Sequence, residues 1–286
     1  MRPRVGHIQF LNCLPLYYGL VKNQVLSDIE LIKGTPTELN QMLVARELDI
    51  SPISSFQYGK HHRFLELLPG ITVSSDGEVK SIFLISKVHI EKLDRKKIAL
   101  TNTSATSQNL LKIILQEKYN LKPEYFVCPP DLSNMLLEAE AALLIGDSAL
   151  KAFYRKPEGL YFYDLGEEWK AMTGHKMVYA VWAVRKEYAQ KYPQVVSKVI
   201  SAFHKSMEYS VQNAASIARE IQKYEIYDVP FLQDYFETLE FRFDKYHLQG
   251  LAAYFQKIYN LGLISELPQI KFFEQPYNQD YRLCAK

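Results

Sequence analysis

The chain has 286 residues, enough for one large or two modest domains, and its 48% apolar content with 13% aromatics can fill hydrophobic cores. Its formal charge of +2 comes from 34 basic and 32 acidic residues that are well mixed, which gives no electrostatic signature for nucleic acid or an anionic membrane. No apolar run approaches the roughly 20 residues that span a bilayer. We therefore expect a globular protein that binds neither nucleic acid nor membrane.

The first twenty residues are basic and then apolar, so a signal peptide has to be weighed against a first strand. They read MRPRVGHIQFLNCLPLYYGL, in which His7, Gln9 and Asn12 interrupt the apolar stretch. No small-residue cleavage site follows. The pattern favours a β-strand over residues 5–10 and a cytoplasmic location.

Short strands alternate with helix starts through the first part of the chain. Thr35-Pro36-Thr37-Glu38 is a capping box with proline in the first turn, and Ser54 or Ser55 begins another short helix. The predicted strands here are residues 5–10, 29–33, 48–53 and 81–87.

The same alternation continues through the middle of the chain. A run of hydroxyl residues at 101–107 precedes a helix, where it predicts an N-cap and also an anion site, because free backbone N–H groups converge there. Asp131 is a further predicted cap. The predicted strands here are residues 97–100, 125–128, 141–145, 160–165 and 177–184.

Helical spacing dominates from Glu187 onward, and no further strand is predicted. Strand and helix alternation followed by terminal helices predicts a two-lobed α/β protein whose chain enters the second lobe once and returns once. The apolar runs at 81–87 and 177–184 are the predicted crossover strands. The first lobe is then residues 1–86 plus 181–286, and the second is residues 87–180.

Small polar residues recur at the carboxyl ends of the predicted strands. One such residue is typical of a cap or a turn, but the recurrence predicts a ligand site, because open α/β sheets bind ligands at that edge. Uncharged donors and helix amino termini suit a ligand that carries carboxylates. Trp169 and Thr173-Gly174 either add contacts from the second lobe or only pack. The polar set is Asn12, Ser54, Ser55, Ser81, Ser104, Thr106 and Ser107, with Asp147 nearby.

Several familiar catalytic motifs do not occur in the sequence. There is no G-x-G-x-x-G, G-x-x-x-x-G-K-[ST], G-x-S-x-G or H-E-x-x-H. Cys13, Cys128 and Cys284 fit neither a disulfide framework nor a paired metal-ligand spacing, so inert thiols are expected. We therefore expect no metal and no cofactor.

The histidines give no clear metal site either. His61 and His62 are adjacent and would point about 100° apart on a helix, so we expect a surface pair and not metal ligands. His7 lies within the first predicted strand, where a core or edge histidine with satisfied hydrogen bonds is the expected role.

Several segments together resemble one enzyme family, and they occur in its order from about Val5 to Tyr188, whereas the helical tail matches loosely. They are FLNCLPLYYGL, GTPTELN, LDISPISSFQYG, SSDGEVKSIFLISK, LTNTSATSQNLLKIIL, ALLIGDSAL, DLGEEWKAMTG and YAVWAVRKEY. The family is chorismate dehydratase, which opens the futalosine route to menaquinone. The resemblance implies a type II periplasmic-binding-protein fold and a cytoplasmic lyase that converts chorismate to 3-[(1-carboxyvinyl)oxy]benzoate and water.

The resemblance also implies roles for individual residues. The family's catalytic asparagine and serine fall on Asn12 and Ser81, which suit hydrogen-bond donors because neither side chain accepts a proton readily near neutral pH. The expected base is the enolpyruvyl carboxylate of the substrate, with Asp147 and His7 as rivals. The expected substrate-binding residues are Ser54, Ser55, Ser104, Ala105, Thr106, Ser107, Gly146 and Asp147.

Other functions remain open at this point. The sister enzyme 1,4-dihydroxy-6-naphthoate synthase carries a His-Glu pair where this chain has Leu144-Ile145-Gly146-Asp147. A solute-binding protein for a small carboxylate should carry an export signal or a lipid-attachment cysteine, for which Cys13 is a poor candidate. A regulatory effector domain should be attached to a DNA-binding segment, which this sequence does not contain. The oligomeric state is open, with a homodimer as one arrangement.

Overall fold

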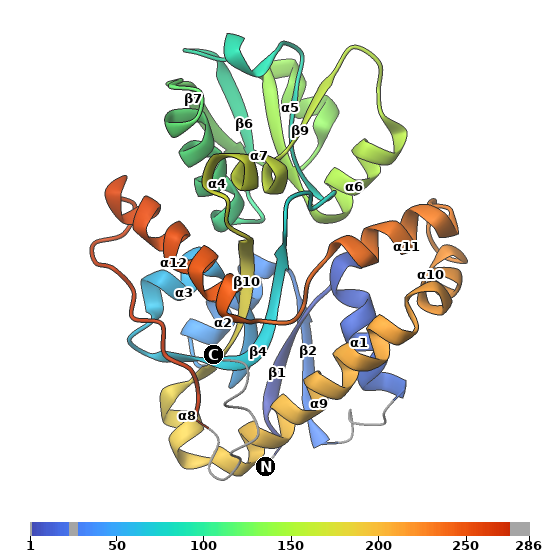
Figure 1. The fold of residues 1–286 in the computed structure, drawn as a ribbon, viewed down its shortest axis with the longest axis vertical. Helices are drawn as coiled ribbons and strands as arrows, with labels where there is room; N and C mark the ends of the chain where they lie inside the picture. Colours follow the sequence, from blue (N-terminus) through green and yellow to red (C-terminus); the bar gives the residue numbers. More distant parts are fainter. Residues whose placement is uncertain (1, 23–27, 275–286) are drawn as a thin grey trace.

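The structure, a computed structural model that describes residues 2–22 and 28–274, has two lobes that each contain a five-stranded sheet (Figure 1). The first sheet contains β1 (Arg4–Ile8), β2 (Glu30–Gly34), β3 (Ile50–Ser54), β4 (Leu65–Ser75) and β10 (Met177–Arg185) in the order β2-β1-β3-β10-β4. The second contains β5 (Ile82–Ser86), β6 (Lys97–Thr101), β7 (Glu124–Cys128), β8 (Ala141–Ile145) and β9 (Tyr161–Asp164) in the order β7-β6-β8-β5-β9. The predicted two-lobed α/β fold is confirmed.

Each sheet combines parallel strands with antiparallel strands that border the interlobe connections. β1 runs parallel to β2 and β3, and β6 runs parallel to β7 and β8. By contrast, β10 is antiparallel to β3 and β4, and β5 is antiparallel to β8 and β9. Every residue of β3, β5 and β8 is buried, as expected for strands covered on both faces.

The two expected crossover strands each belong to a single sheet. All of β5 lies in the second sheet, and all of β10 lies in the first. The chain therefore passes from the first sheet to the second between Ser75 and Ile82, and it returns between Asp164 and Met177. Both passages come earlier in the sequence than the expected lobe boundaries at residues 86 and 180. Both runs are apolar throughout, so their composition suits either sheet and could not place the boundary.

β4 is not among the predicted strands, although it spans Leu65–Ser75. Pro69-Gly70 interrupts its apolar pattern, and Gly70 has a φ of +75°. The pairing of β4 with β10 shifts register twice, so the strand is bent and irregular. Its sequence therefore lacks the regular alternation of apolar and polar residues by which a strand is predicted. Tertiary pairing keeps this irregular segment in the sheet.

Side-chain caps begin many of the helices. Thr35 and Glu38 form both halves of the predicted capping box, and Asp131 caps its helix as expected. The helices before the last strand are α1 (Leu14–Lys22), α2 (Pro36–Val44), α3 (Ser55–His61), α4 (Ala105–Glu117), α5 (Leu132–Glu138), α6 (Gly146–Arg155) and α7 (Leu165–Thr173), and a 3₁₀ turn, η1 (Leu11–Cys13), precedes α1.

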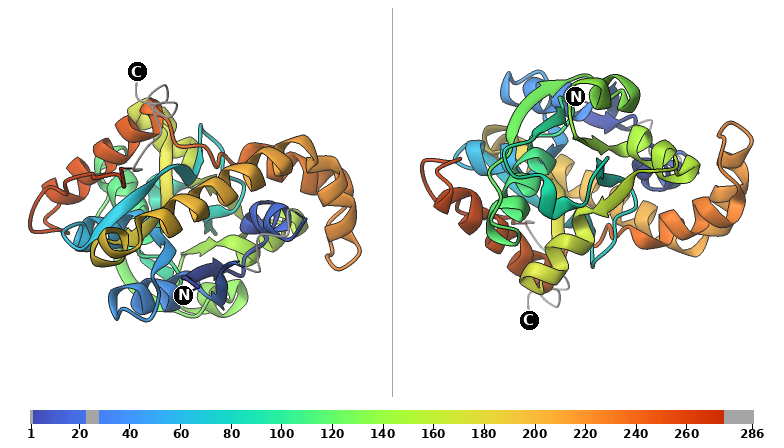
Figure 2. Two further views of the ribbon diagram at one scale, coloured as in Figure 1. Left: turned by 90° about the horizontal axis from the view of Figure 1, so that it is seen from below. Right: turned by 90° about the horizontal axis from the view of Figure 1, so that it is seen from above.

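The terminal helices lie along both sides of the molecule (Figures 1 and 2). α9 packs on α1, α11 contacts α6 through Phe231, and α12 packs on β10 and α4. No helix within residues 2–22 and 28–274 is both long and apolar enough to cross a bilayer. These helices are α8 (Lys186–Lys191), α9 (Pro193–Gln212), α10 (Ala214–Gln222), α11 (Val229–Thr238) and α12 (Lys245–Asn260).

Candidate active site

The carboxyl ends of the parallel strands meet at the interface between the lobes. The segment after β1 contacts the segment after β8, because Leu11 N–H donates to Asp147 Oδ1 over 2.9 Å. The segment after β3 contacts the segment after β6, because Phe56 N–H donates to Thr106 Oγ1 over 3.0 Å. The lobes therefore touch at the sheet edges where open α/β sheets bind ligands.

The first group of predicted residues at this interface is Asn12, Ser81, Gly146 and Asp147, which we call the Asn12 cluster. Asn12 lies in η1, directly after the residue that donates to Asp147. Gly146 N–H donates to the Ser81 carbonyl over 2.8 Å, so the start of α6 is fixed to the start of β5. The predicted catalytic pair and Asp147 thus come from three distant segments and share one region.

Gly146 allows these segments to approach closely. Its φ is +59°, a region that disfavours residues with a Cβ atom. A Cβ atom there would also stand 3.0 Å from Cδ2 of Phe10, in the segment between β1 and η1. Gly146 therefore has a packing role in the Asn12 cluster, and its predicted contact with substrate stays a prediction.

Two buried polar atoms near this cluster make no hydrogen bond of normal length among the described residues: Asn12 Oδ1 and Tyr235 Oη, the latter with the Ser81 hydroxyl near it. We call them the open polar atoms. Buried polar groups in proteins are almost always paired, so each such atom needs an explanation. A ligand that donates to one atom and accepts from the other would satisfy both. Tyr235, on α11, was not among the predicted site residues.

Charge in this cluster comes from Asp147. Although the residue as a whole is exposed, burial of its carboxyl raises the pKa, while the Leu11 N–H lowers it and Glu225 raises it further. Cys13 is buried beside it, and burial together with the Asp147 charge raises the pKa of this thiol to about 12. The thiol is therefore protonated near neutral pH, which agrees with the predicted inert role.

The second group is Ser54, Ser55, Ser104, Thr106 and Ser107, which we call the hydroxyl cluster. Ser54 caps α3 by accepting from Gln57 N–H, and Ser104 caps α4 by accepting from Ser107 N–H. Thr106 joins the two helix starts through Phe56 N–H, so both positive helix ends lie near one another. Ala105, also predicted to bind substrate, is the first residue of α4.

The hydroxyls of this cluster already have protein partners. Ser55 Oγ donates to the Val178 carbonyl over 2.6 Å, and Ser104 Oγ donates to Ser107 Oγ over 3.0 Å. Their role in capping and joining helices is thus evident, and their hold on substrate carboxylates stays a prediction.

The remaining predicted contacts from the second lobe serve packing. Trp169 is fully buried, packs edge-on against Tyr254 and donates its indole N–H to the Lys176 carbonyl over 3.2 Å. Thr173 Oγ1 donates to the Trp169 carbonyl, and Gly174 ends α7 with a φ of +73°. These residues hold the return connection between the lobes.

The outgoing connection is held by a residue that the sequence analysis did not identify. Asp164 is buried and accepts hydrogen bonds from the backbone N–H groups of Val79, Lys80, Gly166 and Glu167 over 2.7 to 3.2 Å. Burial nevertheless raises its pKa to about 6, and the N–H donors act in the opposite direction. Asp164 thus positions the segment that leads into Ser81.

Two expectations about histidines are wrong in part: His62 of the expected surface pair is buried, and His7 is in the core as expected but without hydrogen bonds to the described residues. His62 is the residue that ends α3, and its Nδ1 lies 3.0 Å from the Gly59 carbonyl oxygen. His7 is buried and stacks on Tyr17 with ring centroids 3.7 Å apart, but neither of its nitrogens has a hydrogen-bond partner within the described part of the chain. Burial and the nearby Lys33 lower the pKa of His7 to about 4.

Neither a metal site nor a disulfide is found among residues 2–22 and 28–274. No group of three or more His, Cys, Asp or Glu side chains is arranged to hold a metal ion within those ranges. Cys13 is buried and free, and Cys128 is half-buried and free, with a pKa that burial raises. Cys284 lies outside the described residues.

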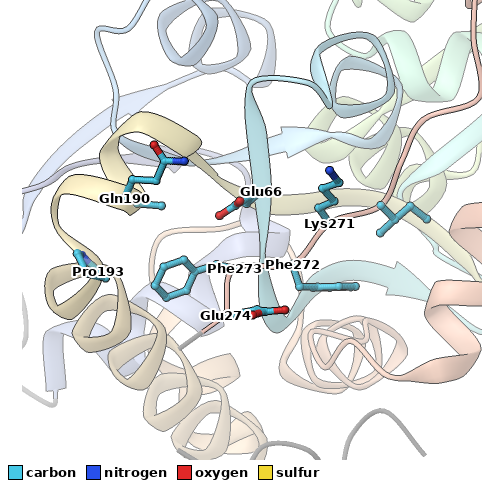
Figure 3. Close-up of a pocket in the computed structure, with 9 residues that line it drawn as sticks. Glu66, Gln190, Pro193, Lys271, Phe272, Phe273 and Glu274 are labelled. Carbon is cyan, nitrogen blue, oxygen red and sulfur yellow. The ribbon is translucent and has the colours of Figure 1, made fainter. Parts of the chain in front are cut away.

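Two cavities lie apart from the predicted residues. One of about 710 Å³ is at the far end of β4 from the interface and is lined by Glu66, Gln190 and Lys271 among others (Figure 3). Another, of about 520 Å³, lies beside the interlobe connections and is lined by Asp76, Lys176 and other polar residues. We place the site at the interface because the open polar atoms and the strand ends converge there, whereas neither cavity has these features.

Solved structures share this fold. A protein of Archaeoglobus fulgidus is 19% identical, covers 92% of this chain and 98% of its own, and superposes with a TM-score of 0.75. A Candida albicans protein with the generic periplasmic binding protein fold is 13% identical, covers 98% and 99%, and gives 0.71. An alkanesulfonate-binding protein of Xanthomonas axonopodis pv. citri, bound to MOPS, is 14% identical, covers 93% and 96%, and also gives 0.71.

Sequence relatives narrow the family. A chorismate dehydratase of Thermus thermophilus is 35% identical over 202 residues, which cover 65% of this chain and 72% of that protein. One of Campylobacter jejuni is 28% identical over 215 residues, which cover 73% and 79%. The model of a family described as menaquinone biosynthesis matches residues 3–260. With its periplasmic-binding-protein fold and these relatives, the chain belongs to this menaquinone biosynthesis family.

Proposed function

We propose that the protein is a cytoplasmic chorismate dehydratase that forms 3-[(1-carboxyvinyl)oxy]benzoate and water in the futalosine route to menaquinone. The observation that carries the proposal is the Asn12 cluster, in which the predicted catalytic residues Asn12 and Ser81 adjoin Asp147 at the interlobe interface. The names of the sequence relatives support the same substrate.

The reaction needs a proton acceptor and hydrogen-bond donors. A base removes the ring proton at the carbon that bears the enolpyruvyl ether, and the electron pair delocalises through the diene toward the ring carboxylate. The neighbouring carbon–oxygen bond then breaks, the hydroxyl leaves with a proton as water, and the ring becomes aromatic. Donors preorganised toward the developing charge contribute on the order of 2.7–4 kcal/mol each in comparable enzymes.

We assign the base role to the enolpyruvyl carboxylate of the substrate. His7 is a weak rival, because burial lowers its pKa to about 4 and its ring is stacked on Tyr17. Asp147 is the stronger rival, because burial raises its pKa and so makes the carboxylate a better proton acceptor than usual. Its Oδ1 is held by Leu11 N–H, however, which leaves Oδ2 for that role.

The hydroxyl cluster is proposed to hold a substrate carboxylate. The amino termini of α3 and α4 meet there, and positive helix ends favour an anion. The lobes have to separate for substrate entry, because Phe56 N–H and Thr106 Oγ1 join them across this region.

Incubation of the purified protein with chorismate tests the function. We expect loss of chorismate and appearance of the enolpyruvyl benzoate, followed by aromatic absorbance and chromatography, and almost complete loss of turnover in the double variant with Asn12→Ala and Ser81→Ala. A protein that binds chorismate tightly without converting it would instead be a solute-binding protein. Native-rate turnover by the double variant would refute the assigned site.

A further inference from the structure

Tyr235 lies at the interlobe interface although it belongs to the terminal helices. Its helix, α11, contacts α6 of the second lobe where Phe231 packs against Phe153 and Tyr154 (Figure 1). The neighbouring Asp234 forms an ion pair of 2.6 Å with Lys80, the residue before Ser81. α11 is therefore fixed to the helix that begins at Gly146 and to the segment that leads into Ser81.

The phenol of Tyr235 faces this cluster. The side chain is 1% exposed, and its Oη is one of the two open polar atoms. Burial raises the pKa of Tyr235, the Ser81 hydroxyl lowers it, and Asp147 and Cys13 raise it further. Tyr235 also lies one helical turn after Phe231, so its side chain is on the face of α11 that packs toward α6, and the adjacent Asp234 pairs with the residue before Ser81.

The two open polar atoms have complementary chemistry. Asn12 Oδ1 can only accept a hydrogen bond, whereas Tyr235 Oη carries a proton to donate. A carboxylate only accepts, so it cannot satisfy Asn12 Oδ1. A hydroxyl both donates and accepts, so one hydroxyl group can satisfy both atoms, and chorismate has one alcohol hydroxyl, which is the group lost in the reaction.

We propose that Asn12 Oδ1 and Tyr235 O–H together bind the hydroxyl that leaves the substrate, so that Tyr235 is a third hydrogen-bond donor of the active site. This inference rests on the proposed function. Asn12 accepts from the hydroxyl proton, and Tyr235 donates to its oxygen while the carbon–oxygen bond breaks and that oxygen takes the bonding electron pair.

Tyr235 acts as a donor and keeps its proton throughout. A buried phenolate beside Asp147 would be strongly disfavoured, because burial and the neighbouring negative charge both raise the pKa of Tyr235. The proton that completes the water comes from the carboxyl group that accepted the ring proton. The proton count then balances without any net change in Tyr235.

The variant Tyr235→Phe removes the donor and keeps the ring. We expect kcat for chorismate to fall about 10- to 100-fold, while the melting temperature changes little, because the buried hydroxyl has at most a weak hydrogen bond with the Ser81 side chain to lose among the described residues. The affinity for added 3-[(1-carboxyvinyl)oxy]benzoate should stay within about threefold of the parent, because this product lacks the leaving hydroxyl.

Tyr58→Phe is the matched control. Tyr58 is also fully buried, but its hydroxyl donates to the Gln269 carbonyl over 3.2 Å, so its loss should lower the melting temperature without changing kcat. Unchanged turnover in Tyr235→Phe would overturn this inference but not the proposed function. An equal loss of turnover and of product affinity would do the same, because it would mean that Tyr235 serves only to pack the site. A parent protein that does not convert chorismate would overturn the proposed function and the inference with it.

Discussion

The Asn12 cluster and the hydroxyl cluster lie at the same interface but differ in how their polar atoms are used. In the hydroxyl cluster, Ser54 and Ser104 accept from backbone N–H groups and cap helices. Near the Asn12 cluster, the two open polar atoms remain. Capping contributes to stability whether or not a ligand is bound, whereas open polar atoms cost stability until something satisfies them.

This difference separates two kinds of polar residue that look alike in the sequence. A serine at a helix start is expected to affect stability first, and a buried amide without a partner is expected to affect activity first. Variants in the two clusters should therefore give opposite combinations of turnover and melting temperature.

The largest effect is expected for Asn12→Ala. Loss of one preorganised polar contact at the reacting centre should lower kcat/KM for chorismate on the order of 100- to 1000-fold. The melting temperature should not fall, because Asn12 Oδ1 is an open polar atom. Steady-state kinetics and thermal unfolding of the same preparation check both parts. If the variant had a lower melting temperature but the turnover of the parent, Asn12 would have a structural role and no catalytic one.

Asp164→Asn tests how the connection before Ser81 is held. The folded-state pKa of Asp164, about 6, is above its ordinary value of 3.8. Its protonation therefore stabilises the folded state fully below about pH 4, and this contribution is lost as the pH rises through 6. The unfolding free energy of the parent, relative to the variant, should fall by about 3 kcal/mol over this range. Urea unfolding at several pH values measures it, and parallel pH curves would contradict it.

Ser104→Ala removes a helix cap in the hydroxyl cluster. Loss of the bond from Ser107 N–H should cost about 1 kcal/mol of stability, or about 2–4 °C in melting temperature. We expect KM for chorismate to rise more than kcat falls, because the proposed role here is to hold a carboxylate. A large loss of kcat at unchanged KM would instead indicate that Ser104 takes part in the chemical step.

The smallest effect is expected for Asp147→Asn. If the substrate carboxylate is the base, the amide can still accept from Leu11 N–H, and turnover should remain within about tenfold of the parent. The pH dependence of kcat/KM should also stay the same. Abolished turnover with retained chorismate binding would make Asp147 the base and end the substrate-assisted mechanism.

Local sequence determined most of the elements and many of their ends, with β4 as an exception. The capping box at Thr35 and Glu38, the cap at Asp131 and the buried strand at residues 141–145 were all predicted and are all present. These features depend on contacts within a few residues, so neighbouring side chains are enough to specify them. The alternation of strands and helices likewise specified the two-lobed α/β class.

Tertiary structure alone decided which sheet takes β5 and β10, that His62 is buried, and that Tyr235 approaches Ser81 from the terminal helices. The apolar runs suit either sheet, and the α11 sequence carries no motif that marks a site residue. Leu11 and Asp147 are far apart in the chain but bonded in space. Such contacts depend on how the lobes close on one another, which no local pattern encodes, because they require packing between segments that are far apart in the chain.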